Sequence, residues 1–352
     1  MEFFTGLVAG AALAAAAPSA EKRAPSPLEV KLEMLGNTEV KAVFTNKGKN
    51  NLKVLKTGSI LDQAPVEKTK VFSGDKPVSF RGARLRIATE ALQEEDFQRI
   101  PAGESVEVTF DIAQVHDLSS GGKFGVLADG ALSFADDKST KLIGSVPYLS
   151  NQVQAEVNGA LAAAAHTAFH DKRARVYDCP GQKLQVIQTA MRNCASMAVK
   201  AQQAAASGPA AKMEEYFKSS SQQIRDIVSN VFSLVASECG SPNTSSSFAD
   251  YYCTDLYSLC KNGPVAYTLV GYDVVVYCPS YFQDSLPDLA NRCHALDRAG
   301  TNMHEATHLL QIKGTEDYHG YGYDAVRRLS AAQNLNHADT YSLFANAIRL
   351  GC

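Results

Sequence analysis

Residues 304–308 read His304-Glu305-Ala306-Thr307-His308. In a helix, residues four positions apart project from the same face one turn apart. The two imidazoles can therefore bind one zinc ion while Glu305 points at the metal's remaining position. Zinc with three protein ligands keeps that position for water, from which Glu305 would take a proton and later deliver it to a leaving amine. The stretch therefore predicts a helix, one zinc ion per chain and hydrolysis of peptide bonds.

The third zinc ligand has to come from outside this motif. Gly314 can end the expected helix in a left-handed conformation, and the turn after it can bring Asp317 beneath the metal. Asp339 is the main alternative, but it opens an expected helix, where acidic residues also serve in the first turn. We rank Asp339 as a residue that orients one imidazole. The other downstream candidates are Glu316, His319, Asp324 and His337. We expect both of these histidines to be exposed in turns.

The eight cysteines divide the chain into two unlike halves. All of them lie between Cys179 and Cys352. An even number of cysteines confined to one half of a secreted chain predicts a disulfide framework for that half alone. The first half has no thiol, so it cannot keep an enzyme inactive by placing a thiolate on the zinc.

The first twenty residues are typical of a secretory signal peptide. An apolar run from Phe3 to Ala17 leads into small residues that end at Ala20, although Glu2 stands where a basic flank is usual. No other stretch approaches the roughly 20 apolar residues of a transmembrane helix. The net charge of −3 implies no nucleic-acid partner. We therefore expect a secreted, extracellular protein whose partners include neither membrane nor nucleic acid.

The hydrophobic pattern of the first half predicts a β-rich domain. Apolar and polar residues alternate with a period of two, bounded by Gly, Asn and Asp. The alternating runs are 28–34, 40–44 and 106–112.

After Arg175 the pattern becomes helical. Apolar residues recur at spacings of three and four, which predicts two amphipathic helices before residue 240 with a break at Gly208-Pro209. Three consecutive valines predict a strand over 273–277, and from about Gly300 the chain is expected to be helical again.

Two pairs of basic residues flank the cysteine-free region. Lys22-Arg23 follows the apolar run, and Lys172-Arg173 precedes the cysteine-rich half. Their coincidence with both boundaries favours cleavage by a dibasic-specific processing protease. The expected parts are a signal peptide (1–20), a β-rich propeptide (21–175) and a mature, mainly helical catalytic domain (176–352), with Ala174 and Val176 as alternative first residues of the mature chain.

Several segments together resemble the deuterolysin family, fungal neutral protease II, whose members are called aspzincins because an aspartate completes the zinc site. The precursor layout is also similar. The matching segments are His304–His308, the Gly-Thr-x-Asp turn at 314–317 with Tyr321-Gly322 after it, Cys278-Pro279-Ser280-Tyr281, and 336–341. The chain departs from the family in having three residues, rather than two, between Asp317 and Tyr321.

This resemblance implies an α+β fold, zincin-like in the catalytic domain, and zinc metalloendopeptidase activity. The tyrosine that stabilises the tetrahedral intermediate corresponds to Tyr321 or to Tyr281, and both stay candidates. The residues that the resemblance assigns to zinc are His304, His308 and Asp317, with Glu305 as the general base.

The resemblance also implies a disulfide pattern. The implied pairs are Cys179–Cys253, Cys260–Cys278 and Cys293–Cys352. Cys194 and Cys239 are left over, and each lies on one of the two long helices that we expect. We therefore expect a fourth bridge between these helices.

The implied partners are protein and peptide substrates, among them basic proteins such as histones and protamines, and the chain's own propeptide before processing. We expect a monomer. One alternative is a secreted binding protein with a structural zinc, which the two-histidine motif disfavours because structural zinc sites usually have four ligands that include cysteines. Another is a metalloprotease outside the aspzincins, which would not need Asp317.

Overall fold

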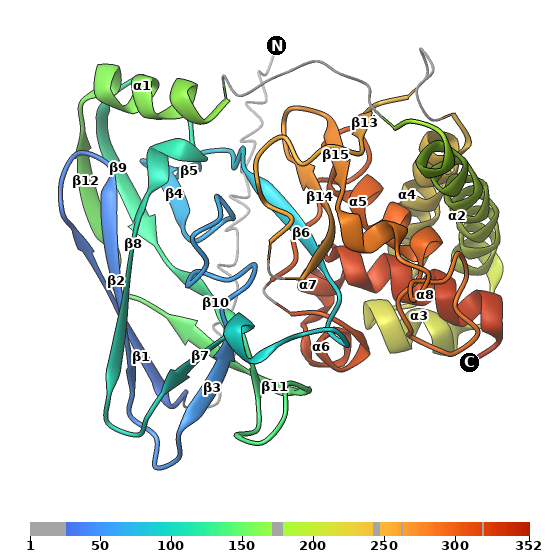
Figure 1. The fold of residues 1–352 in the computed structure, drawn as a ribbon, viewed down its shortest axis with the longest axis horizontal. Coiled ribbons are helices and arrows are strands. Elements are labelled where there is room, and N and C mark those ends of the chain that lie inside the picture. The colour runs from blue at the N-terminus through green and yellow to red at the C-terminus, as the bar shows by residue number, and fades with distance from the viewer. Residues whose placement is uncertain (1–25, 171–178, 242–246, 262, 319) are drawn as a thin grey trace, which may run out of the picture.

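Figure 1 shows the computed structural model of the chain. It describes residues 26–170, 179–241, 247–261, 263–318 and 320–352. The expected signal peptide, both dibasic pairs, the two candidate first residues of the mature chain and His319 lie outside the described residues. We call residues 26–170 the amino-terminal half and residues 179–352 the carboxy-terminal half.

The three alternating runs of the sequence form one antiparallel sheet in the amino-terminal half. Its strands are β1 (Leu28–Met34), β2 (Glu39–Asn46) and β8 (Ser105–Asp111), with β2 in the centre. Alternation places Val40, Ala42 and Phe44 on one face of β2, and all three are completely buried. The expected β-rich character of this half is therefore confirmed.

Two four-stranded sheets complete the amino-terminal half, in the orders β11-β10-β3-β7 and β12-β9-β4-β5. Residues from all three sheets share one hydrophobic core. The remaining elements here are β3 (Leu52–Leu55), β4 (Lys70–Ser73), β5 (Lys76–Pro77), β7 (Phe97–Ile100), β9 (Gly122–Leu127), β10 (Asp129–Ala135), β11 (Leu142–Leu149), β12 (Val153–Val157), α1 (Gly159–His170) and the short 3-10 helices η1 (Glu94–Asp96) and η2 (Ile112–Gln114).

One strand of the amino-terminal half belongs to the sheet of the other half. β6 (Ala83–Ile87) is hydrogen-bonded to β14 (Pro264–Leu269) at the edge of a sheet whose order is β13-β15-β14-β6. The other two strands are β13 (Asp250–Tyr252) and β15 (Val274–Tyr277). Figure 1 shows β6 lying between the two halves. One strand from before the expected boundary near residue 175 therefore completes the sheet of the carboxy-terminal half.

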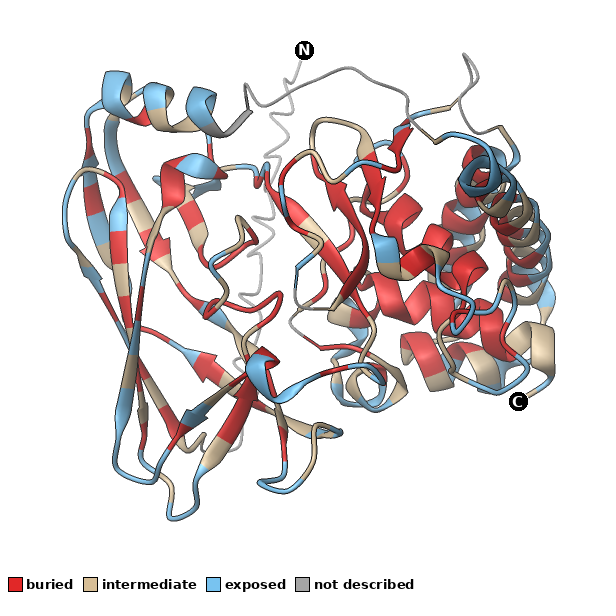
Figure 2. Cartoon of the chain, viewed as in Figure 1, coloured by how far each residue is buried: buried red, intermediate tan, exposed pale blue. Residues whose placement is uncertain are grey.

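The carboxy-terminal half is mainly helical around its own buried core (Figure 2). The two long amphipathic helices expected from the sequence are present as α2 and α4, and they pack on each other. The helices are α2 (Gln182–Ser207), α3 (Ala210–Phe217), α4 (Gln222–Gly240), α5 (Arg298–His308), α6 (Tyr323–Arg328), α7 (Ala331–Asn334), α8 (Ala338–Leu350) and the 3-10 helix η3 (Pro279–Phe282). The α+β fold class is confirmed.

The break at Gly208-Pro209 is followed by a short helix that we did not predict from the sequence. α3 starts directly after Pro209, whose fixed φ suits the entry to a helix, and ends at Lys218, which has the left-handed φ of 56°. No helix of the described residues is long and apolar enough to span a bilayer.

Four disulfides cross-link the carboxy-terminal half. The pairs are Cys179–Cys253, Cys194–Cys239, Cys260–Cys278 and Cys293–Cys352. The second pair joins α2 to α4, as the positions of its cysteines on the two expected helices suggested. These are the pairs expected from the sequence and from the resemblance.

Candidate metal centre

Helix α5 carries the His-Glu-x-x-His motif and is buried along its whole length. Asp297 caps its amino terminus, where the carboxylate accepts a hydrogen bond from the backbone N–H of Gly300 at 2.6 Å. The helix ends at His308, because Leu309 has the extended backbone angles φ −62° and ψ 131°. Gly314 does have a left-handed φ of 67°, but it lies in the following turn, so the expectation that it ends the helix is wrong.

Three ligand atoms meet at one point next to α5. His304 Nε2 and His308 Nε2 lie 3.1 Å apart, and Asp317 Oδ1 is 3.3 Å from the first and 3.5 Å from the second. Zinc bonds of about 2.0–2.2 Å at tetrahedral angles separate ligand atoms by about 3.3–3.5 Å. Asp317 Oδ1 is also buried without a hydrogen-bond partner among the described residues. The three residues therefore fit zinc as its protein ligands.

Both histidines present the correct nitrogen to this point. His304 Nδ1 donates to Asp339 Oδ1 at 2.9 Å, and His308 Nδ1 donates to the backbone carbonyl of Thr315 at 2.9 Å. Each bond leaves the Nε2 lone pair free for a metal. Burial lowers the pKa of His308 to about 3 and lowers that of His304 well below its usual value. Both imidazoles are therefore neutral, as zinc ligands must be.

Glu305 is held by a residue of the adjacent strand β14. Thr268 Oγ1 donates to Glu305 Oε2 at 2.6 Å, whereas Glu305 Oε1 is buried without a hydrogen-bond partner among the described residues. Burial raises the pKa of Glu305 well above its usual value, and the hydrogen bond from Thr268 opposes that rise. The carboxylate is thus fixed by one oxygen and keeps the other available as a proton acceptor.

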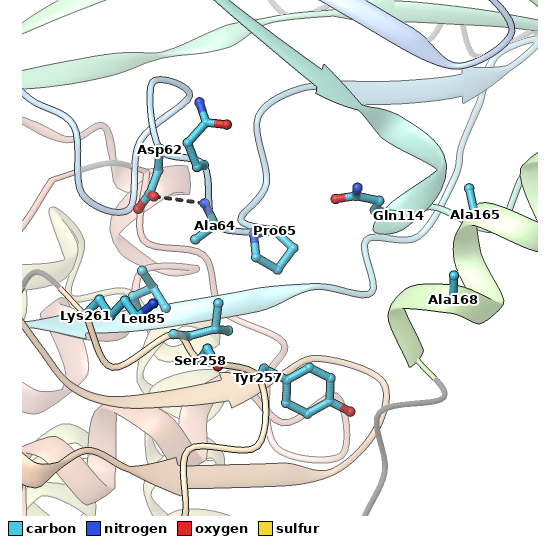
Figure 3. A pocket seen from close by; sticks show the side chains of 12 residues that line it. Asp62, Ala64, Pro65, Leu85, Gln114, Ala165, Ala168, Tyr257, Ser258 and Lys261 are labelled. Carbon is cyan, nitrogen blue, oxygen red and sulfur yellow. Dashed lines mark hydrogen bonds between the residues drawn. The ribbon is translucent and has the colours of Figure 1, made fainter.

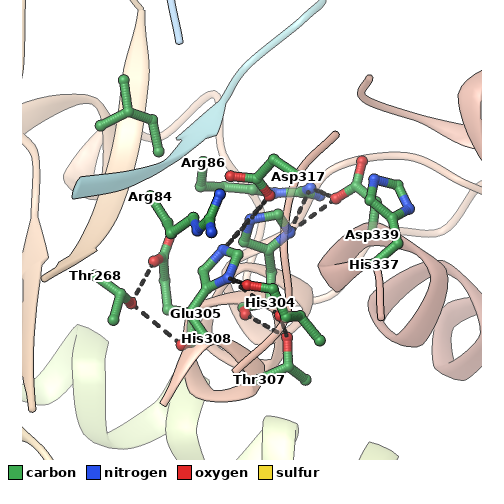
Figure 4. Close-up of polar contacts among 12 residues, drawn as sticks. Arg84, Arg86, Thr268, His304, Glu305, Thr307, His308, Asp317, His337 and Asp339 are labelled. Carbon is green, nitrogen blue, oxygen red and sulfur yellow. Dashed lines mark hydrogen bonds and ion pairs between the residues drawn. The ribbon is translucent and has the colours of Figure 1, made fainter. Parts of the chain in front are cut away.

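Asp339 lies in the first turn of α8 and connects three parts of the site. Besides His304, it accepts a hydrogen bond from the backbone N–H of Gly322 at Oδ2, 2.7 Å away, and forms an ion pair with Arg86 of β6. Figure 4 shows Asp339 beside His304 and Arg86 beneath strand β6. Asp339 therefore contacts a candidate ligand rather than the ligand triangle itself.

The other downstream candidates stay outside the ligand triangle. Glu316 pairs with Lys70 at 2.8 Å, and Asp324 is an exposed residue of α6. His337 was expected to be exposed in a turn, which is wrong: it is completely buried. Its Nε2 donates to the carbonyl of Gly320 at 3.0 Å, so tertiary packing against the loop before α6 buries the ring.

The structure separates the two candidate tyrosines. Tyr281 is completely buried in the core of the carboxy-terminal half and donates its hydroxyl hydrogen to Asn302 Oδ1 at 3.0 Å. Tyr321 donates to the backbone carbonyl of Leu85 in β6 at 3.2 Å. Burial raises the pKa of Tyr321 well above its usual value, and the negative charge of Asp317 adds to the rise. The phenol of Tyr321 therefore keeps its proton beside the candidate metal site.

Three residues at this centre were missed from the sequence. Thr268, Arg84 and Arg86 lie on strands, where a hydroxyl or a single charge has no distinctive spacing. The alternation of Arg84 and Arg86 around an apolar residue was the one available signal. It indicates a strand but does not indicate which sheet the strand joins.

Two of the cavities at the contact between the halves are large. One, of about 540 Å³, is lined by residues of both halves, among them Gln114, Ala165, Tyr257 and Leu85 of β6 (Figure 3). The other, of about 440 Å³, includes Tyr321 in its lining. Neither cavity is lined by the ligand triangle, and both of its histidines are completely buried.

The chain is similar to several known proteins. The chain is 49% identical to a "Neutral protease 2 homolog" of Colletotrichum graminicola, with 100% of each chain covered. It is 40% identical to "Neutral protease 2" of Aspergillus oryzae, over 99% of this chain and 98% of the relative. Among solved structures it is similar to a zinc peptidase from Grifola frondosa, with a TM-score of 0.37 and 17% identity, over 48% of this chain and 97% of that chain.

The model of the deuterolysin metalloprotease (M35) family matches residues 2–352. This match covers both halves, including the buried group of His304, His308 and Asp317. The chain therefore belongs to the deuterolysin metalloprotease family and is a zinc metalloendopeptidase.

Proposed function

We propose that the chain is the precursor of a secreted endopeptidase in which His304, His308 and Asp317 hold the zinc and Glu305 is the general base. The observation that carries this proposal is the spacing of the three ligand atoms, 3.1, 3.3 and 3.5 Å apart, with the unpaired oxygen of Asp317 among them. Bound zinc would supply Lewis acidity and would lower the pKa of water at the site.

Glu305 performs the proton transfers. Its free oxygen Oε1 accepts a proton from the attacking water, and the same carboxyl then gives that proton to the nitrogen of the leaving amine. Thr268 binds the other oxygen, so the carboxyl keeps one orientation through both transfers.

Tyr321 is the better candidate for stabilising the oxyanion. Its phenol is within the electrostatic influence of Asp317 and is hydrogen-bonded to a backbone carbonyl, which is the group that a substrate presents. The hydroxyl of Tyr281 is instead bound to Asn302 within the core. Asp339 orients the ring of His304 and, through Gly322, the loop that carries Tyr321.

The proposed precursor has a signal peptide over 1–20, a propeptide over 21–175 and a mature domain over 176–352. The placement of all eight cysteines after residue 178 supports this division, because disulfides stabilise the part that works outside the cell. A dibasic-specific protease would release the mature, monomeric enzyme from its propeptide.

A preference for basic proteins, such as histones and protamines, is part of this proposal. Its support is the group of carboxylates at the centre, Glu316, Asp317 and Asp339. The basic side chains that lie against them in the precursor belong to the propeptide. Relative rates of hydrolysis of a lysine- and arginine-rich peptide and of its glutamine-substituted counterpart test this preference.

The function is tested on the chain after cleavage by a dibasic-specific protease. We expect one zinc per chain, and casein hydrolysis that 1,10-phenanthroline abolishes and added zinc restores. Asp317→Ala removes both zinc and activity, whereas Asp324→Ala, at an exposed aspartate of the same half, changes neither. Absence of stoichiometric zinc, or hydrolysis that is indifferent to the chelator, refutes the proposal.

A further inference from the structure

Strand β6 is the point at which the amino-terminal half enters the candidate active site. We infer that Ala83–Ile87 is a pseudo-substrate, an extended segment that occupies the place of a substrate along β14 and keeps the precursor inactive. This inference rests on the peptidase function proposed above. The binding surface is the edge of β14, and the ligand class is an extended peptide with two basic side chains around an apolar one.

The pairing of β6 places its centre beside the proposed general base. The strand runs antiparallel to β14, and Arg84 lies opposite Thr268, the residue that binds Glu305. Leu85 lies opposite Tyr267 and Arg86 opposite Ala266. An edge strand pairs with an added strand through its backbone groups, which recognises an extended chain irrespective of most side chains. The segment is therefore extended along the strand edge next to the proposed general base, where an extended substrate would pair.

One backbone carbonyl of β6 already makes the contact that we assign to a substrate. The oxygen of Leu85 accepts a hydrogen bond from the phenol of Tyr321 at 3.2 Å. Gly58 of the amino-terminal half closes over the same hydroxyl: it has a left-handed φ of 71°, and a Cβ at this position would lie 2.9 Å from the hydroxyl oxygen. A substrate carbonyl cannot reach Tyr321 while this segment is bound.

Arg86 attaches β6 to the carboxy-terminal half directly, whereas Arg84 is linked to that half only through Glu67 and Lys70. Arg86 pairs with Asp339, and its Nη1 is 3.2 Å from His304 Nδ1. Arg84 Nη2 is 2.5 Å from Glu67 Oε2. Glu67 also binds Lys70, which reaches Glu316 next to the candidate ligand Asp317. Buried ion pairs of this kind fix the register of a strand, because each slip leaves a charge unpaired.

The centre is sealed in the presence of β6. His304, Glu305 and His308 are each 0% exposed, and Asp317 is 7% exposed. Leu85 and Ile87 pack on the apolar side against the core that includes Tyr267 and Tyr321. Access to Glu305 therefore requires that β6 leaves β14, which makes removal of the amino-terminal half the activating step.

The first test compares the activity of one chain before and after processing. We expect the uncut wild-type chain to hydrolyse a short fluorogenic peptide at least about 100-fold more slowly than after dibasic cleavage, because β6 and substrate exclude one another. For the Arg84→Gln/Arg86→Gln chain, the ratio of the rate after cleavage to the rate before cleavage should be at least about 10-fold smaller than for wild type. The matched control is Arg99→Gln, an exposed arginine of β7, for which the ratio stays as in wild type.

A second readout does not depend on activity. Hydrogen exchange of the backbone amides of 265–269 in the uncut chain reports whether β6 is paired with β14. We expect exchange at least about 10-fold faster in Arg84→Gln/Arg86→Gln than in wild type or Arg99→Gln. Equal protection in all three chains would show that the arginines do not hold the strand and would overturn their assigned role.

A synthetic peptide of residues 81–89 keeps the inference testable if the double variant does not fold. We expect this peptide to inhibit the cleaved chain competitively, at least about 10-fold more tightly than the same peptide with both Arg84 and Arg86 replaced by Gln. Equal or non-competitive inhibition by the two peptides overturns the inference. A cleaved chain without zinc-dependent hydrolysis refutes the proposed function instead, whereas an uncut chain as active as the cleaved one refutes only the pseudo-substrate.

Discussion

The two halves of the chain reach a stable fold in different ways. The amino-terminal half has three sheets around one core and no cysteine, whereas the carboxy-terminal half is mainly helical and has four disulfides. A disulfide restricts the unfolded chain, so it stabilises only the half that contains it. The covalently strengthened half is the one with the metal centre, and the other half can unfold or leave without disturbing those bridges.

The halves also differ in the charges that they bring to their contact. The cations Lys70, Arg84 and Arg86 come from the amino-terminal half, and the carboxylates Glu316 and Asp339 come from the carboxy-terminal half. On the proposed function, a basic substrate would therefore compete with these cations for the same two carboxylates. The metal centre and the disulfides therefore belong to one half, and the other half brings three cations to the contact, two of which also pair with its own Glu67.

The largest expected effect of a substitution is the loss of activity at Glu305, in the half that contains the metal centre. In the cleaved chain, Glu305→Gln should lower kcat by about 10³- to 10⁴-fold, because glutamine cannot accept the proton from water. Zinc content should stay at the wild-type value, since Glu305 is not a ligand. The measurement is hydrolysis of a fluorogenic peptide together with metal analysis. The control is Glu214→Gln, an exposed glutamate of the same half. A cleaved Glu305→Gln chain with more than a tenth of wild-type activity would contradict the assignment.

The next effect tests whether the bridges stabilise one half alone. Cys194→Ala/Cys239→Ala opens a loop of 45 residues, which lowers the stability of the carboxy-terminal half by about 3 to 4 kcal/mol in the chain-entropy model. Hydrogen exchange of the uncut chain should become faster in α2 and α4 and stay unchanged in β1, β2 and β8. Cys260→Ala/Cys278→Ala, with a separation of 18, should cost less. An equal loss of protection in both halves would show that this bridge does not stabilise the carboxy-terminal half alone.

A smaller effect concerns the charges of the contact and depends on pH. Burial of Glu67 opposes its ionisation, but Arg84 and Lys70 outweigh burial and lower the pKa of Glu67 to about 2. A folded pKa below the ordinary 4.5 stabilises the folded chain at higher pH, and this contribution disappears as the pH falls from about 4.5 through 2. At pH 6, Glu67→Gln should therefore lose on the order of 2 kcal/mol of stability.

Denaturant unfolding of the uncut chain at several pH values measures this difference. The gap between wild type and Glu67→Gln should close as the solution is acidified toward pH 2. Glu104→Gln, at an exposed glutamate of the same half, should show no gap at any pH. A gap for Glu67→Gln that stays constant with pH would mean that the ionised carboxylate does not stabilise the folded chain.

The parts of the centre that could be predicted are those set by local geometry. His304 and His308 share a face because helix geometry alone brings residues four apart together. Asp317 is only nine residues further along, so a single turn returns it to the helix end. The bridge between Cys194 and Cys239 could also be predicted, because the spacing of apolar residues indicated both of the long helices that carry these cysteines.

The parts that could not be predicted depend on distant partners. A five-residue strand such as Ala83–Ile87 has the same alternation whichever sheet accepts it, and its partner β14 is about 180 residues away in the chain. His337 was expected to be an exposed turn residue, yet its ring is buried, and the Gly320 carbonyl that binds it belongs to another loop. Thr268 carries no pattern at all, since a hydroxyl on a strand is common.

The smallest expected effect is at Asp339, where the charges of the two halves meet. In the cleaved chain, which has lost Arg86, the carboxylate still orients His304 through the 2.9 Å contact with Nδ1. Asp339→Asn keeps the shape but weakens that bond, so zinc affinity measured by competition with a chelator should fall about 10- to 100-fold. Asp284→Asn, at an exposed aspartate, should leave the affinity unchanged. Wild-type zinc affinity in Asp339→Asn would mean that Asp339 serves only the contact with the amino-terminal half. This carboxylate would then contribute to the binding of β6 and not to the binding of zinc.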